Sequence, residues 1–222
     1  MDTVEQARAY AAADFSEAHQ SYVTLFDRTF PERPARAAAL DLGCGPADVT
    51  RRFARANPRY TFDAVDGSSA MLALARRAVR GALRKRIRLI EGYIPGAPIP
   101  RKRYGVILSS SFLHHLPDPQ VLWQCVRAHA RPGTLVFVTD LFRPASRARA
   151  RALLRRYAAG EAPILRRDFY NSLLAAFTPR EIRRQLRQAR LGWLRVHIIS
   201  DRHLAICGTR PGRPPRTRRP AP

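Results

Sequence analysis

The sequence predicts an α/β protein built on a doubly wound, mostly parallel sheet of seven strands with helical lid segments. Three observations predict this fold. Short apolar runs alternate with amphipathic helical stretches, a glycine-rich turn follows the first apolar run, and the last two strands lie too close together to be parallel. With 222 residues, the chain is long enough for one such domain and a modest addition.

The expected strands and helices alternate along the body of the chain. The strands are predicted at 37–41, 61–65, 87–90, 104–108, 134–139, 194–200 and 203–208. The helices between them are predicted at 49–57, 69–79, 118–130 and 178–191. Asp118 is the expected N-cap of its helix, and Thr178 caps the last helix with Pro179 at its first position. Parallel strands linked in this way require right-handed crossovers.

The end of the chain departs from this alternation. Only Asp201 and Arg202 separate the strand at 194–200 from the strand at 203–208. So short a connection can form only a hairpin, which makes one of the two strands antiparallel. The sequence therefore predicts a parallel sheet with an antiparallel C-terminal hairpin strand.

Two helical segments are expected to act as lids over residues 35–209, the main domain. Residues 1–34 form the first, because apolar side chains recur at helical spacing over 3–30 and Pro31 and Pro34 end the run. Residues 141–177 form the second, an insertion after a strand's carboxyl end with expected helices at 145–159 and 166–177. The arginine- and proline-rich tail, 210–222, is expected to be disordered.

The net charge of +23 is the most unusual feature of the composition. All but two of the 40 basic residues are arginine; only Lys85 and Lys102 are lysine. Two explanations remain open: a GC-rich genome that favours arginine codons, or a polyanionic partner such as nucleic acid.

Other features point to a cytoplasmic protein without a metal site. No apolar run approaches the roughly 20 residues that span a bilayer, and the acidic start of the chain is unlike a secretory signal. The three cysteines, Cys44, Cys125 and Cys207, are far apart and form no C-x-x-C pair. Neither a disulfide framework nor a zinc site is expected.

A glycine-rich loop, Asp41-Leu42-Gly43-Cys44-Gly45-Pro46, follows the first strand, and Asp66 ends the second. In an open α/β sheet, ligands bind at this edge, and an acid about 20 residues after the glycines suits a ribose. Three details disfavour a dinucleotide: position 48 is Asp rather than a third glycine, Pro46 lacks an N–H, and Asp41 would repel a pyrophosphate. A cofactor bearing an ammonium group would be attracted instead.

Residues 37–140 resemble a class I S-adenosylmethionine-dependent methyltransferase of the small "methyltransferase domain" type. The matching segments include Leu40–Pro46, Val65–Leu72, Glu91-Gly92, Ser111–Pro119 and Arg131–Thr134, together with the reversed last strand. The resemblance implies a Rossmann-like fold, S-adenosylmethionine as cofactor and S-adenosylhomocysteine as product.

The resemblance also implies roles for individual residues at the cofactor. Asp41 faces the amino group, Gly43 and Gly45 allow close backbone approach, and Asp66 accepts both ribose hydroxyls. The remaining implied contacts are Gly67, Ser68 and Met71 beside the adenine, Gly92 and Tyr93 at its far edge, and Ser109 and Ser110 near the methionine portion. The sequence departs from the family pattern at Tyr93 and Gly105, where an acid is usual.

Residues for catalysis and acceptor binding are weaker candidates. His114, Asp140 and Tyr170 are candidate catalytic residues, although helix capping, packing and lid contacts explain them as well. The candidate acceptor-binding residues lie on the lids or follow the fourth strand, and are Tyr10, His19, His115, Arg166, Arg167 and Asn171.

The leading functional hypothesis is methyl transfer to a small-molecule acceptor. After the fourth strand the chain reads His114-His115-Leu116-Pro117 and lacks the polar–Pro–Pro–aromatic motif that base-modifying enzymes often carry there. Two alternatives stay open: an RNA or protein methyltransferase that uses the arginine-rich lid and tail, and a non-methylating protein that binds or modifies the cofactor.

Overall fold

The computed structural model describes residues 15–212, which contain one seven-stranded sheet. Its order is β3-β2-β1-β4-β5-β7-β6. The first five strands of the chain are parallel, and β7 runs antiparallel to both β5 and β6. The strands are β1 (Ala38–Leu42), β2 (Thr61–Asp66), β3 (Ile87–Glu91), β4 (Tyr104–Ser110), β5 (Ala130–Leu141), β6 (Arg195–Ile198) and β7 (His203–Thr209). This confirms the predicted doubly wound sheet and its reversed hairpin strand.

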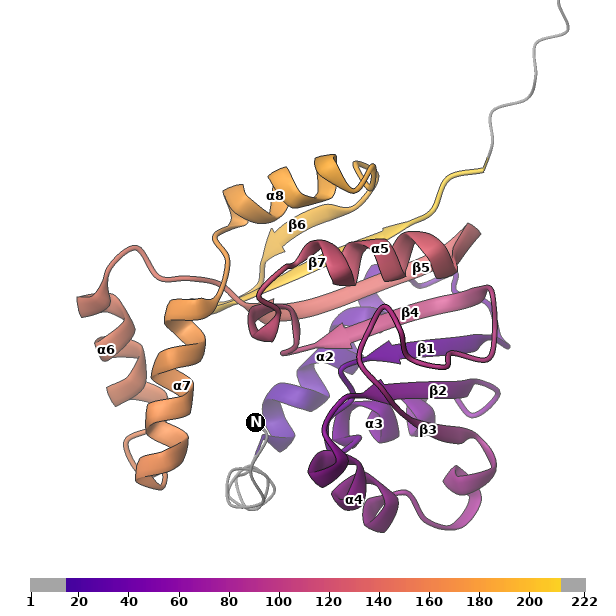
Figure 1. The fold of residues 1–222 in the computed structure, drawn as a ribbon, viewed down its shortest axis with the longest axis horizontal. Helices are drawn as coiled ribbons and strands as arrows, with labels where there is room; N and C mark the ends of the chain where they lie inside the picture. The colour runs from indigo at the N-terminus through magenta and orange to yellow at the C-terminus, as the bar shows by residue number, and fades with distance from the viewer. Residues whose placement is uncertain (1–14, 213–222) are drawn as a thin grey trace, which may run out of the picture.

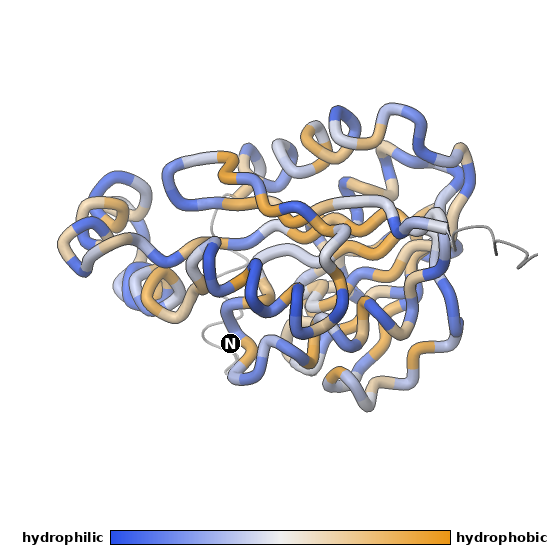
Figure 2. The backbone as a smooth tube through the Cα atoms, turned by 90° about the horizontal axis from the view of Figure 1, so that it is seen from above, coloured by the Kyte–Doolittle hydropathy of each residue, from blue (hydrophilic) through white to orange (hydrophobic). Residues whose placement is uncertain are grey.

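Helices cover both faces of the sheet, as Figure 1 shows. One face carries α2 (Ser16–Thr29), α3 (Asp48–Ala56) and α4 (Ser69–Ala78), and the other carries α5 (Gln120–His129) and α8 (Pro179–Gln188). In Figure 2 the hydrophobic colour follows the central strands, whereas the helices alternate in colour along their length. The two apolar layers bury the sheet between them, which holds its strand ends in fixed positions.

The helix α2 is part of this packed body as well as an expected lid. Its Tyr22 and Phe26 are almost fully buried, and Phe26 meets Phe53 of α3 and Phe137 of β5 at ring-centroid distances of 5.2 and 5.6 Å. Residues 1–14, which include Tyr10, and residues 213–222 of the tail lie outside the described part of the chain. The N-terminal helix is therefore built into the sheet's apolar layer over residues 16–29.

The insertion expected to act as the second lid consists of α6 (Arg147–Tyr157) and α7 (Pro163–Ala175). These helices stand at the end of the sheet toward which the parallel strands point (Figure 1). They pack on each other around a small cluster that includes Leu141, Leu153 and Leu173. This insertion has its own apolar centre.

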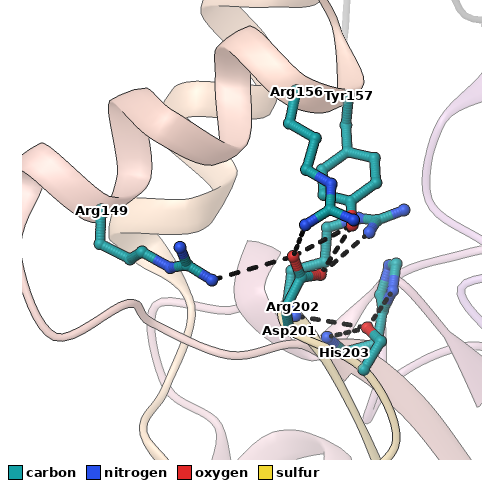
Figure 3. Close-up of polar contacts among 7 residues, drawn as sticks. Arg149, Arg156, Tyr157, Asp201, Arg202 and His203 are labelled. Atoms are coloured by element: carbon teal, nitrogen blue, oxygen red, sulfur yellow. Dashed lines mark hydrogen bonds and ion pairs between the residues drawn. The ribbon is translucent and has the colours of Figure 1, made fainter.

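A clasp of polar side chains ties α6 to the turn between β6 and β7 (Figure 3). The Tyr157 hydroxyl donates to the Asp201 carboxylate, with distances of 3.1 and 3.0 Å to its two oxygens. The Arg202 guanidinium lies 3.3 Å from the centre of the Tyr157 ring and 3.2 Å from Asp201. Arg149 and Arg156 approach the same carboxylate at 3.9 and 3.6 Å. The lid is thus held to the hairpin turn.

Local details differ from the predicted elements in a few places. The helix expected from Asp118 begins at Gln120 with Pro119 as its N-cap, although the Asp118 side chain still accepts the Gln120 N–H at 2.9 Å. Thr178 caps α8 as predicted, in a reciprocal capping box with Glu181. Two short 3₁₀ turns, Gly81–Lys85 and Leu113–His115, were not predicted. The second of them shapes the site described next.

Within residues 15–212, no helix is long and apolar enough to cross a bilayer. The same part of the chain holds no group of three or more histidine, cysteine or acidic side chains placed to bind a metal ion. Cys44, Cys125 and Cys207 are buried and unpaired.

Candidate active site

A cavity of about 470 Å³ opens at the carboxyl ends of β1, β2 and β4, within the size range of small-molecule sites. Most of the predicted cofactor residues line it. They are Asp41, Gly43, Gly45, Asp66, Gly67, Ser68, Met71, Gly92, Tyr93 and Ser110. The predicted acceptor residues His19 and His115 line it too. The strand order therefore brings these segments, far apart in sequence, to one crevice.

The loop after β1 turns back sharply to begin α3. Gly43 and Gly45 adopt positive φ angles of 75° and 53°, and the amides of Gly43 and Cys44 donate to the Val65 carbonyl at 2.9 and 3.0 Å. A Cβ atom on Gly43 would lie 2.2 Å from the Phe112 ring, so no other residue fits there. The first glycine is required by this ring and by its own backbone conformation.

Asp41 lines the cavity and carries an unsatisfied acceptor. Its side chain is buried, one oxygen accepts the Thr50 hydroxyl at 2.6 Å, and the other, Oδ1, has no hydrogen-bond partner. Burial raises the pKa of Asp41 to about 6; the Thr50 bond lowers it and the nearby Asp66 charge raises it. A buried acceptor without a donor is costly, so this oxygen is suited to a cationic N–H donor from a ligand.

Asp66 organises the rim on the opposite side of the loop. One oxygen accepts the Gly45 amide at 2.7 Å, and the other accepts the Ser68 amide at 2.8 Å. Each carboxylate oxygen can accept a second bond, so contacts to a diol remain compatible with this arrangement. The Ser68 hydroxyl in turn caps α4 by accepting the Met71 amide at 3.3 Å.

An aromatic ring flanks this rim. Tyr93 is 76% exposed, and a Cβ atom on Gly67 would lie 2.5 Å from its ring. The ring thus lies directly over the Gly67 backbone, and the buried Met71 lines the same cavity. An open aromatic face of this kind suits a flat heterocycle, in place of the acid usual at position 93.

A buried histidine–aspartate pair lies behind the cavity wall after β4. His114 Nδ1 is 2.5 Å from Asp140 Oδ1, which also accepts the Leu141 amide at 2.6 Å. Burial alone would raise the pKa of Asp140, but the neighbouring His114 lowers it below the ordinary value. The His115 ring, which lines the cavity, lies 4.1 Å from the His114 ring between centroids. Of the two histidines, His115 faces the cavity and His114 supports it.

The turn that carries these histidines is conformationally strained. Ser111 lines the cavity with a φ of 50°, unusual for a residue with a side chain. The Tyr22 side chain of α2 lies near Ser111: burial raises the pKa of Tyr22 to about 12, the Asp140 charge adds to the effect, and Ser111 lowers it. The N-terminal helix therefore reaches the same turn that bears His114 and His115.

His19 of α2 forms a second histidine–aspartate pair at the cavity. Its Nδ1 lies 2.9 Å from Oδ2 of Asp48, the first residue of α3. The Arg52 Nε donates to the same oxygen at 2.7 Å. These contacts lower the pKa of Asp48, the His19 hydrogen bond being the largest cause.

Several predicted residues lie elsewhere in the described structure. Ser109 is buried and donates to the Leu42 carbonyl at 2.7 Å, a contact between strands. Tyr170 packs against the apolar cluster of the lid. His114 and Asp140 do not line the cavity, and neither do Arg166, Arg167 and Asn171, which are exposed on α7.

The sequence reasoning missed several lining residues, notably Asp48, Ser111 and Phe112. The place of Asp48 at the start of a helix beside a ligand loop is a sequence signal that could have identified it. Among the described lining residues there is no arginine or lysine, and Asp41, Asp48 and Asp66 are all acidic. The described lining of the cavity in this basic protein is therefore acidic.

The sheet is doubly wound, and Asp41 and Asp66 lie at the carboxyl ends of β1 and β2. The loop between them does not suit a pyrophosphate. Such a site suits a nucleoside cofactor that carries an amino acid. Residues 40–136 match the family described as "Methyltransferase domain". Residues 40–136 are thus similar to the methyltransferase domain of class I S-adenosylmethionine-dependent enzymes.

Curated relatives resemble the central part of the chain. It is 35% identical over 138 residues to a trans-aconitate 2-methyltransferase of Mycobacterium ulcerans, covering 61% of this chain and 48% of that protein. It is 30% identical over 130 residues to a malonyl-[acyl-carrier protein] O-methyltransferase of Halalkalibacterium halodurans, covering 55% and 46%. The chain thus spans about half the length of the curated relatives it matches.

A solved structure shows the same fold over nearly the whole chain. A methyltransferase from Aquifex aeolicus superposes with a TM-score of 0.67, covering 91% of this chain and 96% of that one at 14% sequence identity. At this identity, the likeness concerns the fold alone.

Proposed function

We propose that the protein transfers a methyl group from S-adenosylmethionine to a small-molecule acceptor. The observation that carries the proposal is the unsatisfied, buried Asp41 Oδ1, placed in one cavity with Asp66. An ammonium group would satisfy this oxygen and keep Asp41 ionised. The relatives named as methyltransferases support the same activity.

The residues of the cavity would hold the cofactor in the way the family resemblance implies. Asp41 binds the amino group, Asp66 binds the ribose hydroxyls, and the Tyr93 ring packs on the adenine. Gly67, Ser68, Met71 and Gly92 border the same group, and Ser110 lies toward the methionine portion. The cofactor supplies a methyl group on a sulfonium, an activated donor that leaves positioning and exclusion of water as the main tasks of the protein.

We assign the acceptor to the side of the cavity formed by His115 and Ser111. The named relatives act on trans-aconitate and on malonyl-[acyl-carrier protein], and we propose an oxygen nucleophile here. An ionised carboxylate would need only orientation by His115. A hydroxyl would need a base, and His114 held by Asp140 would then support His115 in accepting the proton.

Labelled cofactor tests the proposal. The purified protein is first titrated with S-adenosylhomocysteine by calorimetry and then incubated with methyl-labelled S-adenosylmethionine and a small-molecule extract. We expect binding and a labelled acceptor of low molecular mass. Binding without label in any acceptor would favour a non-methylating role, and absence of binding would overturn the proposal.

The free, buried cysteines support a cytoplasmic location.

A macromolecular acceptor is a second candidate, favoured by rows of exposed arginines. Arg147, Arg151 and Arg155 repeat every four residues on α6. A further row on α8 consists of Arg180, Arg183, Arg184 and Arg187. Such rows suit phosphate groups or acidic protein surfaces. Label found in RNA or protein instead of small molecules would select this candidate.

A further inference from the structure

We infer that His19, on the N-terminal helix, binds the carboxylate of the cofactor's methionine portion, an inference that rests on the proposed function. The amino-acid end of S-adenosylmethionine carries an ammonium and a carboxylate on one carbon. The cavity provides Asp41 for the ammonium, but the carboxylate requires a donor, preferably a cation. Identifying that donor shows which element completes the cofactor site.

The described lining residues leave few candidates for this donor. None is arginine or lysine, and only His19 and His115 have side chains that can become cationic. The start of α3 is a poor anion site, because Pro46 lacks an N–H and Asp48 places a carboxylate in the first turn. The choice therefore lies between the two histidines.

The first turn of α3 decides between them. Thr50 of this turn donates to Asp41, and Asp48, two residues earlier, is paired with His19. The partner of the ammonium and His19 therefore attach to the same helical turn. His115 instead follows β4 and stacks on His114. An ammonium and a carboxylate bonded to one carbon need partners that are neighbours, which favours His19.

The surroundings of His19 suit an anionic ligand. The ring is only 7% exposed, and its Nδ1 is hydrogen-bonded to the Asp48 carboxylate. This bond fixes the ring and leaves Nε2 as the nitrogen for the ligand. An imidazole nitrogen that carries its hydrogen donates to a carboxylate oxygen. Without His19, the Asp48 carboxylate would keep its Arg52 partner but would lie near the ligand's carboxylate and repel it.

Calorimetric affinities for two ligands test the inference. The ligands are S-adenosylmethionine and its decarboxylated form, which keeps the ammonium, sulfonium and nucleoside. We expect His19→Ala to weaken S-adenosylmethionine binding about tenfold to a hundredfold. The affinity for the decarboxylated ligand should change less than about threefold, since it lacks the group that His19 holds. His19→Gln, which keeps a neutral amide in the helix, should show the same selectivity.

Control variants separate this effect from unfolding and from the rival histidine. His197→Ala, at an exposed position of β6 away from the cavity, should bind both ligands like the unmodified protein. The double variant His19→Ala/Asp48→Asn should recover part of the lost affinity, because the repelling carboxylate is gone.

Each contrary outcome has a distinct meaning. Equal losses for both ligands in the His19 variants would overturn the inference, as would a selective loss in His115→Ala in place of His19→Ala. If the unmodified protein bound neither ligand, the proposed function itself would fail.

Discussion

Asp41 is a residue whose ionisation is unfavourable until a ligand arrives. Its pKa of about 6 in the folded protein is above the ordinary value of 3.8. Between these two values the folded chain holds more protons than the unfolded chain, so stability falls as pH rises through this window. Above about pH 6 the full cost of the buried charge is present.

Asp41→Asn should therefore stabilise the cofactor-free protein at neutral pH while weakening cofactor binding. We expect a gain of about 1–3 kcal/mol in the free energy of unfolding at pH 7.5. The gain should shrink as the pH approaches 4, where Asp41 is protonated in the folded state. Urea denaturation at both pH values measures it. An Asn variant less stable than the parent at pH 7.5 would contradict the assigned cost.

Asp66→Ala should lower cofactor affinity about tenfold to a hundredfold by removing charge-assisted hydrogen bonds. Asp66 also holds the Gly45 and Ser68 amides, so part of the loss will reflect a looser rim. Asp66→Asn keeps one acceptor oxygen, so its cofactor affinity should lie between those of the unmodified protein and of Asp66→Ala. Calorimetry with S-adenosylhomocysteine distinguishes them, and an unchanged affinity in the Ala variant would remove Asp66 from the ribose.

At the residue scale, the sequence predicted the parts of the site that depend on local spacing. Asp41, the two glycines and Asp66 follow directly from strand ends and turn chemistry. The His19–Asp48 pair could not be predicted, because it depends on how α2 docks across the sheet. Contacts between distant segments require the packing of whole elements, which spacing alone does not encode.

Among the elements, the lid helix α6 is held by the clasp at Asp201. Tyr157→Phe keeps the ring under Arg202 but removes the hydroxyl bond to the carboxylate. We expect a local loss of about 0.5–1.5 kcal/mol, seen as faster amide hydrogen exchange over residues 147–157. Arg151→Ala, an exposed change on the same helix, is the matched control. Equal exchange in both variants would mean that the hydroxyl does not hold the lid.

The capping box of α8 should be worth a measurable part of the stability. Thr178→Ala removes the hydroxyl that accepts the Glu181 amide at 3.2 Å. A loss of about 1 kcal/mol is expected in chemical denaturation, whereas Thr178→Ser should lose little. If the serine variant were as unstable as the alanine variant, the Thr178 methyl group would be the important part.

Element types were predictable where periodicity and turn signals agreed, as in β1, β2, α4 and the β6–β7 hairpin. The strand β5 was underestimated at its start, because Arg131-Pro132-Gly133 carries turn-forming residues yet lies within an extended strand. The short 3₁₀ turn at Leu113–His115 also escaped prediction, since three residues are too few to show a period.

At the scale of the molecule, the described arginine and lysine side chains lie outside the cavity. The arginine rows lie on exposed faces of α6 and α8, while the described cavity is lined by acids. Binding of S-adenosylhomocysteine, which has no net charge, should therefore change less than about twofold between about 50 mM and 200 mM salt. Any RNA binding should weaken steeply over the same range. A cofactor affinity as salt-sensitive as RNA binding would contradict this separation of charges, and calorimetry in both buffers measures it.

Because α2 belongs to the apolar layer, the part of the chain that folds together is longer than the part that matches the family. The family match begins at residue 40, yet Tyr22, Val23 and Phe26 fill the layer over β5 and α3. A shortened chain that began at residue 35 would present the Phe53 and Phe137 rings to solvent. Such a fragment would keep every motif of the family match, but its exposed apolar surface would make it prone to aggregate. The shortest fragment that folds stably must therefore include α2, which lies before the family match.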